Sequence, residues 1–191
     1  MRKVFLLMNT SLDGFTNGPN GEMDWFPVND EAWHFVNDLL SNVDTALIGR
    51  VTYEGFVKFW PAAASSPSSS EHEVSFSHWI DKTPKIVFST TLKKAFWPNT
   101  EIISKNVREE MDKHKRQPGK DMVIFGGAGL AQTLTEYGLI DEYWIKVHPV
   151  VLGGGNPLFR NLDKRLPLTL KETRVFDSGV VAFRYVPEMQ Q

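Results

Sequence analysis

The chain has 191 residues and nearly balanced charges, with 21 Lys and Arg against 23 Asp and Glu and a formal net charge of −2. It contains no cysteine, which excludes disulfides, thiolate metal sites and cysteine nucleophiles. The balance of charges leaves no basic field for nucleic acid. A hydrophobic share of 41% is enough for one core, so we expect a single domain over residues 1–191.

The N-terminal apolar run is short, covering residues 4–8. Five residues are too few for the core of a signal peptide and far too few to span a bilayer. We therefore expect a cytoplasmic protein that has no membrane partner.

Short runs rich in Val, Ile, Phe and Leu predict strands buried on both faces, at residues 4–8, 45–48, 85–88 and 122–125. Apolar residues at helical spacing lie between them, over residues 32–40 after the N-cap candidate Asn29 and over residues 130–137 before Gly138. Strands that alternate with helices predict an α/β fold with a mostly parallel central sheet flanked by helices.

The last third of the chain has a different pattern. Residues 142–152, 166–176 and 180–186 are strand-like, and turn residues separate them at 153–157 and 177–179. We expect antiparallel C-terminal strands that close the edge of the sheet.

Two polar stretches predict surface structure. Small residues and serines dominate residues 61–73, a composition that cannot bury a face, so we expect a mobile loop there. Residues 105–120 mix basic and acidic side chains, which is typical of the exposed face of a helix rather than of a nucleic-acid patch.

A glycine cluster follows the predicted strand at 122–125. It reads Gly126, Gly127, Ala128 and Gly129, and Leu130 opens the next predicted helix. Glycines let backbone N–H groups approach an anion, and a helix N-terminus adds unpaired donors with a partial positive charge. The alternative is a tight strand–helix turn without a ligand. The spacing matches neither the Gly-x-Gly-x-x-Gly fingerprint nor a P-loop.

Two more predicted strands end in groups that suit anions. Gly49, Arg50 and Thr52 follow the strand at 45–48, and Ser89 and Thr90 follow the strand at 85–88. The alternatives are an ordinary strand terminus with a surface arginine and a serine/threonine turn followed by solvated lysines. In open α/β sheets ligands bind beyond the carboxyl ends of the strands. Three such ends together favour a ligand with several phosphates.

These motifs resemble a known family. Residues 48–53, the Ser89-Thr90 pair and residues 125–130 occur in the order, and near the spacing, of the NADPH site of the dihydrofolate reductase fold. Residues 9–14, 21–25 and 141–155 are more similar to the reductase domain of bacterial bifunctional riboflavin-biosynthesis deaminase/reductases. The resemblance extends from about residue 3 to residue 186.

The resemblance implies a dihydrofolate reductase-like fold and an NADPH site. It assigns Gly49, Arg50 and Thr52 to the phosphates of the cofactor, and Ser89 and Thr90 to the adenosine 2′-phosphate. It assigns the pyrophosphate cradle to the turn of Gly126, Gly127, Ala128, Gly129 and Leu130, and the cover of the nicotinamide to the segment from Asn9 to Thr16. Lys93 and Lys94 add positive charge that favours NADPH over NADH.

Two carboxylates are candidates for assisting protonation. Asp30 lies closest to the first-helix carboxylate of dihydrofolate reductases, although an acid in a first helical turn is also favoured by the helix dipole. Asp13 is the candidate that the riboflavin-type relatives imply, although it can instead bond its own turn before Gly14.

The function we expect is an NADPH-dependent reductase of a pteridine- or pyrimidine-like heterocycle. Several aromatic side chains are candidates either for a pocket around a flat ring or for the core: Trp25, Trp33, Phe35, Phe56, Phe59 and Trp60. The alternative function is a non-catalytic NADP-binding module or sensor. The five histidines show no ligand spacing, so we expect no catalytic metal. The riboflavin-type resemblance implies a homodimer.

Overall fold

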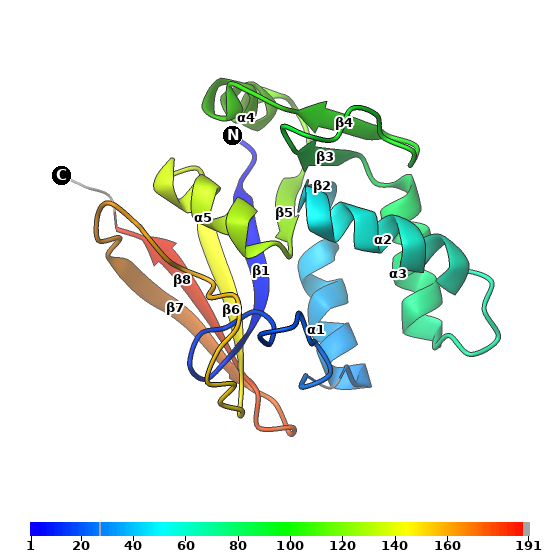
Figure 1. Cartoon of the computed structure of the whole chain (residues 1–191), viewed down its shortest axis with the longest axis vertical. Helices are drawn as coiled ribbons and strands as arrows, with labels where there is room; N and C mark the ends of the chain where they lie inside the picture. The colour runs from blue at the N-terminus through cyan, green and yellow to red at the C-terminus, as the bar shows by residue number, and fades with distance from the viewer. Residues whose placement is uncertain (27, 189–191) are drawn as a thin grey trace.

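The structure of the protein is a computed structural model, which describes residues 1–26 and 28–188. Its frame is an eight-stranded sheet with the strand order β4-β3-β2-β5-β1-β6-β8-β7 (Figure 1). The strands are β1 (Val4–Ser11), β2 (Val43–Gly49), β3 (Lys85–Phe88), β4 (Thr100–Ile103), β5 (Asp121–Phe125), β6 (Glu142–His148), β7 (Leu168–Val175) and β8 (Val181–Pro187). The helices are α1 (Asp30–Leu40), α2 (Arg50–Ala63), α3 (Glu71–Lys82), α4 (Val107–Arg116) and α5 (Ala128–Glu136).

The six strands from β4 to β6 in the sheet order run parallel to their neighbours. The predicted strands at 4–8, 45–48, 85–88 and 122–125 are confirmed as β1, β2, β3 and β5. Their continuous apolar sequence reflects burial on both faces, since successive side chains of a strand point to opposite sides. In β1, Phe5 and Leu7 join one core cluster, whereas Val4 and Leu6 join the other.

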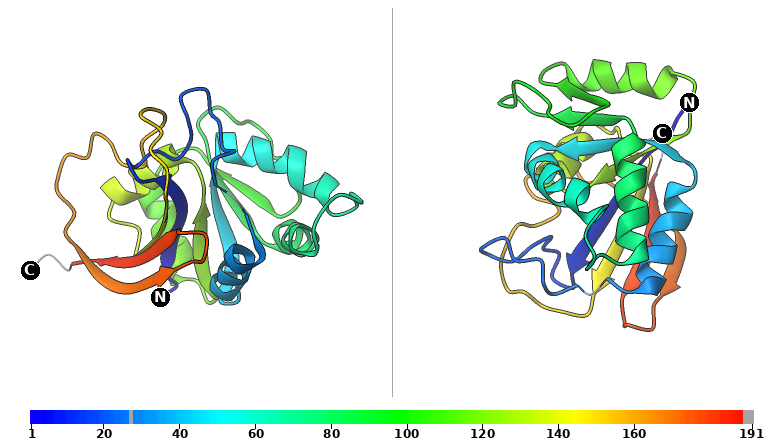
Figure 2. Two further views of the ribbon diagram at one scale, coloured as in Figure 1. Left: turned by 90° about the horizontal axis from the view of Figure 1, so that it is seen from below. Right: turned by 90° about the vertical axis from the view of Figure 1, so that its right-hand side faces the viewer.

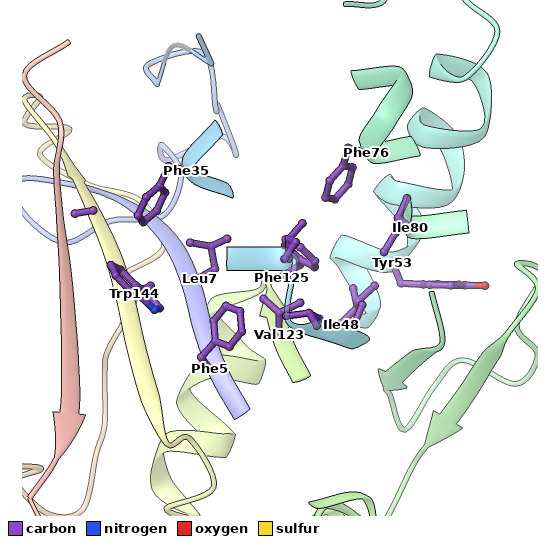
Figure 3. Close-up of a cluster of buried hydrophobic side chains, with 14 of the residues drawn as sticks. Phe5, Leu7, Phe35, Ile48, Tyr53, Phe76, Ile80, Val123, Phe125 and Trp144 are labelled. Carbon is purple, nitrogen blue, oxygen red and sulfur yellow. The ribbon is translucent and has the colours of Figure 1, made fainter. Parts of the chain in front are cut away.

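The two core clusters lie on opposite faces of the sheet. One contains side chains of α1, α2 and α3, including Phe35, Tyr53 and Phe76, packed against β1, β2 and β5 (Figure 3). The other contains side chains of α4 and α5. Figure 2 shows the resulting layers. Among the described residues, no helix combines the length and the apolar character needed to cross a membrane.

The antiparallel C-terminal strands are confirmed for β7 and β8. β8 pairs antiparallel with β6, and β7 pairs antiparallel with β8. The expectation is only half right for β6, because this strand also pairs parallel with β1 and ends at His148. The crossover through α5 returns the chain in the direction of β5 and β1, which makes β6 the last strand of the parallel part.

The predicted loop over residues 61–73 is too long at both ends. Helix α2 continues through Pro61 to Ala63, and α3 begins at Glu71. The start of α3 is fixed by a capping box between Ser70 and Glu73. Pro61 has no N–H and therefore removes one hydrogen bond from the last turn of α2, and only two residues of the helix follow it.

Helix α3 and strand β4 were not among the predicted elements. The exposed helix predicted within residues 105–120 is confirmed as α4, which buries Met111 and Lys115 and leaves most of its surface polar.

Glu142 ties the start of β6 to its neighbours. Its carboxylate accepts hydrogen bonds from Arg184 Nε at 2.9 Å and from Lys3 Nζ at 2.7 Å. Burial raises the pKa of this carboxyl, but the hydrogen bonds and charges of Arg184 and Lys3 outweigh burial and lower the pKa below its ordinary value of 4.5. The ionised Glu142 carboxylate therefore stabilises the folded protein above the unfolded-state pKa. This stabilisation is lost as the pH falls through the folded-state pKa.

Replacing Glu142 by Gln is expected to lower the free energy of unfolding at pH 7 by about 1–2 kcal/mol, because two cations lose a partly buried partner. The difference from the wild type is expected to shrink as the pH falls from 4.5 through the lower folded-state pKa, where the wild-type carboxyl also becomes neutral. Urea unfolding at several pH values measures it, with Glu172→Gln as the control because Glu172 is half exposed and lies 3.8 Å from Arg184. A difference that does not depend on pH would contradict this reading.

Candidate functional site

Three neighbouring parallel strands present the predicted anion motifs at one edge of the sheet. β3, β2 and β5 are adjacent in the sheet, and all three end at this edge. Gly49 ends β2, Ser89 follows β3, and Gly126 follows β5. The structure therefore brings the three motifs to one side of the molecule.

The glycine turn after β5 lies against the start of α2. Gly126 and Gly127 have φ angles of 55° and 76°, which are left-handed conformations that glycine adopts without strain. A Cβ atom added to Gly126 would lie 3.2 Å from Thr52 Oγ1, and one added to Gly127 would lie 3.3 Å from the same atom. The sequence needs glycine here both for the backbone angles and for the close approach of the two turns.

Two helices begin at this contact without a side-chain cap. Gly49 is the N-cap of α2 and Gly127 is the N-cap of α5, and neither has a side chain that accepts a hydrogen bond. The first backbone N–H groups of a helix have no intrahelical partner and carry the positive end of the helix dipole. Ala128 and Gly129 occupy the first turn of α5. The arrangement suits a ligand with two linked anionic groups.

A pocket rich in cations lies next to the start of α2. It has a volume of about 270 Å³ and is lined by Arg50, Glu54, Thr91, Leu92, Lys93, Lys94 and Phe96. Arg50 Nη1 lies 2.9 Å from a Glu54 carboxylate oxygen. Because both side chains are exposed, this pair is weak and leaves the guanidinium available to another anion.

The predicted 2′-phosphate residues lie beside this pocket rather than in its lining. Ser89 Oγ accepts hydrogen bonds from the N–H groups of Thr91 and Leu92, at 3.2 and 2.9 Å. This is the serine/threonine turn that the sequence left open as an alternative. Thr90 is exposed. Thr91, the third residue of this hydroxyl run, lines the pocket instead, together with Phe96, which sequence reasoning missed.

The loop after β1 packs against the loop after β6. Thr16 donates its N–H and its hydroxyl to the carbonyl of Asn156, at 2.8 and 3.0 Å. Phe15 forms a β-bridge with Pro157. Within β1, Asn9 Oδ1 lies 3.0 Å from His148 Nε2 of β6. The segment predicted to cover a nicotinamide is thus held by the C-terminal third of the chain.

Asp13 connects these two loops. Its carboxylate accepts hydrogen bonds from the Ser11 hydroxyl at 2.7 Å and from the N–H groups of Leu152 and Gly153 at 3.1 and 2.8 Å. The Ser11 hydrogen bond is the main cause that lowers the pKa of Asp13. This carboxylate is therefore ionised at neutral pH and organises the loops.

Asp30 is the first residue of α1, as expected for the first-helix acid. Its side chain is 89% exposed, and its Oδ1 lies 3.5 Å from His72 Nε2 of α3. The N-cap predicted at Asn29 is confirmed, because its side chain accepts a hydrogen bond from the N–H of Ala32. The structure therefore does not bring Asp30 and Asp13 to one buried site.

The aromatic candidates divide between core and surface. Phe35 is buried, and Trp33, Phe56 and Trp60 pack against the core around Phe76. Phe59 is half exposed, whereas Trp25 makes an edge contact with His148. Trp25 is the member of this set that lies beside the loops described above.

Comparisons with known proteins identify the family. The family model described as "RibD C-terminal domain" matches residues 2–182. The Bacillus subtilis (strain 168) protein YyaP, described as uncharacterized, is 37% identical over 185 residues, which cover 96% of this chain and 94% of YyaP.

Two solved structures share the fold. A pyrimidine reductase-like protein from Corynebacterium diphtheriae aligns with a TM-score of 0.70 and 13% identity, over 99% of this chain and 93% of the other. Dihydrofolate reductase from Enterococcus faecalis, complexed with NADP(H), aligns with a TM-score of 0.64 and 16% identity, over 97% of this chain and 96% of the other. The chain has a dihydrofolate reductase-like fold and belongs to the RibD C-terminal domain family.

Proposed function

We propose that the protein is an NADPH-dependent reductase that transfers a hydride to a pteridine- or pyrimidine-like heterocycle. The observation that carries the proposal is the contact between two uncapped helix N-termini, at Gly49 and Gly127, beside a pocket lined by three cations. Membership of a reductase family supports the same reading.

The cofactor phosphates fit the chemistry of this edge. The N–H groups that open α2 and α5 would hold the pyrophosphate, since both helix ends present unpaired donors. The turn of Gly126 and Gly127 has no Cβ atoms in the way, and a side chain there would lie tightly against Thr52. Asn9, Thr16 and Leu130 remain proposed contacts of the cofactor, on the strength of the family resemblance.

The cationic pocket fits an additional phosphate. The lining of this pocket contains three cations, Arg50, Lys93 and Lys94, and one acidic residue, Glu54. A 2′-phosphate distinguishes NADPH from NADH, and cations placed around it strengthen binding of the phosphorylated cofactor. Ser89 and Thr90 would support the site through the turn that positions Thr91.

The bound cofactor would supply the hydride, and this chain's residues would orient the reactants and exclude water. The loop held by Asp13 lies over the carboxyl ends of β1 and β6. As an ionised group, Asp13 would act through its charge and through the loop geometry. Asp30, at the start of α1, would orient the heterocycle for protonation.

A non-catalytic NADP-binding module is the second candidate. It is favoured by one observation, namely that Asp13 is engaged in loop hydrogen bonds while Asp30 is largely exposed. Such a module would bind NADPH without reducing any heterocycle.

The wild-type protein is expected to bind NADPH more tightly than NADH, and Arg50→Ala is expected to weaken NADPH binding by about 1–3 kcal/mol through loss of a charge-assisted hydrogen bond. Quenching of tryptophan fluorescence on titration measures both affinities. Lys58→Ala is the matched control, because Lys58 lies exposed on the same helix and does not line the pocket. Binding of neither nucleotide would refute the proposal.

Asp30→Asn is expected to lower kcat about tenfold or more without changing the affinity for NADPH. The measurement is the loss of NADPH absorbance with dihydrofolate or a pyrimidine acceptor that supports turnover. Glu31→Gln is the control, because Glu31 lies in the same helical turn and shares any dipole effect. An equal loss of kcat in both variants would mean that Asp30 acts only through its interaction with the helix dipole. The absence of turnover with any acceptor would favour the non-catalytic NADP-binding module.

We also propose a homodimer. β7 is an edge strand on which Leu170 and Val175 are exposed, at 49% and 69%, and an unpaired edge invites pairing with a second chain. Light scattering is expected to give a mass of about 43 kDa, twice the chain mass of 21.7 kDa. A monomer mass at micromolar concentration would rule out the dimer.

A further inference from the structure

The fold buries three lysines, and two of them are fully paired. Lys85 Nζ donates to the carbonyls of Ile80 and Thr83, both at 2.7 Å, and lies 4.7 Å from the centre of the Trp97 ring. Lys115 Nζ lies 2.7 Å from a carboxylate oxygen of Asp141. These two lysines hold together segments of the fold.

Lys146 of β6 is different. It is 8% exposed, yet within residues 1–26 and 28–188 its Nζ makes no hydrogen bond or ion pair. Burial alone lowers its pKa to about 8, with no nearby carboxylate acting against it. Most of the Lys146 side chain is removed from water while its ammonium group has no partner within the described residues, which disfavours the charged form.

A second polar group beside Lys146 also lacks a partner. His148 lies two residues along β6, on the same face, and is 3% exposed. Its Nε2 lies 3.0 Å from Asn9 Oδ1. Because an amide oxygen accepts, this contact assigns the ring hydrogen to Nε2 and a lone pair to Nδ1. Nδ1 is buried and makes no hydrogen bond within the described residues. Burial and the charge of Lys146 lower the pKa of His148 to about 4, so the ring stays neutral.

Aromatic rings and the carboxyl ends of strands surround this pair. The rings of Trp25 and Phe26 lie 5.4 and 5.5 Å from the His148 ring. Trp144, on the same face of β6, packs against Phe35 of α1 (Figure 3). β6 adjoins β1, and β1 adjoins β5, whose end carries the glycine turn. The pair therefore lies at the same edge of the sheet as the proposed cofactor site.

We propose that Lys146 and His148 form the polar end of the substrate pocket, where Lys146 Nζ donates to a carbonyl oxygen of a flat heterocycle and His148 Nδ1 accepts the adjacent ring N–H. Trp25 and Phe26 then contact the ring itself. That the ligand is a heterocycle rests on the proposed function.

The chemistry of the two groups selects this kind of ligand. One donor and one acceptor side by side match the edge of a lactam, in which a carbonyl stands next to an N–H. A phosphate or carboxylate would satisfy Lys146 but would place a second lone pair against His148 Nδ1. A purely apolar ligand would leave both groups unpaired.

The test compares two probes and matched variants of the full chain. Lumazine carries lactam edges on a flat bicyclic ring, and 1,3-dimethyllumazine has the same carbonyls without those N–H groups. Binding of each probe is measured by fluorescence, with and without saturating NADP⁺, and the His148 nitrogen resonances are followed by NMR. Lys146→Met and His148→Phe test the pair, and Lys85→Met is the control for a buried lysine that serves the fold.

The wild type is expected to bind lumazine and to shift the Nδ1 resonance of His148. Lys146→Met is expected to weaken that binding about tenfold or more without lowering the thermal midpoint, because the fold loses no hydrogen bond or ion pair among the described residues. Lys85→Met is expected to lower the midpoint. The wild type is expected to bind the dimethyl probe more weakly than lumazine. His148→Phe is expected to bind the two probes with equal, weak affinity.

Three results would overturn the assignment: lumazine that does not bind the wild type, lumazine that binds Lys146→Met as tightly as the wild type, or a Lys146→Met midpoint that falls as far as that of Lys85→Met. A parallel NADPH titration separates the two proposals. Lumazine binding that depends on Lys146 without any NADPH binding would refute the reductase and keep the pocket. NADPH binding without lumazine binding would refute the pocket and keep the cofactor site.

Discussion

The parallel arrangement of β3, β2, β5, β1 and β6 is the constraint on which the candidate site depends. Parallel strands require crossovers, and each crossover brings a helix N-terminus to the edge where the preceding strand ends. In this chain β2 leads into α2 and β5 leads into α5 at that edge. The two helix ends approach each other closely at Gly127 and Thr52, so unpaired N–H donors gather at one point, next to the guanidinium of Arg50.

The other polar groups at this edge divide into those whose hydrogen bonds are satisfied within the fold and those that lack a partner. Asp13 is satisfied by the loops that it joins, and Ser89 by the turn that it caps. His148 Nδ1 is buried without a partner among the described residues, and the largely buried Lys146 makes no hydrogen bond or ion pair with them. Buried polar groups are nearly always hydrogen-bonded in native proteins. Unpaired groups next to a strand end are therefore the most informative feature for ligand chemistry, because a ligand can supply the missing partner.

The sequence predicted the parallel strands and the glycine turn well, because continuous apolar runs and a strand followed by Gly126 and Gly127 have few other structural explanations. It predicted less of what depends on tertiary packing. The composition of residues 61–73 favoured a loop, yet α2 continues through Pro61 to Ala63, where Trp60 packs against Phe76. Lys146 and His148 give no local signal, since only the pairing of β6 with β1 shows that they are buried beside Asn9.

The central claim is that the N-termini of α2 and α5 together bind the pyrophosphate of a nicotinamide cofactor. Backbone amide NMR spectra of the protein, recorded as NADP⁺ is added, test it directly. The account predicts the largest shifts at Arg50 to Thr52 and at Gly127 to Gly129, together and with one affinity, because these amides would gain an acceptor that they lack. Saturable binding that leaves both sets of amides unmoved would contradict the account.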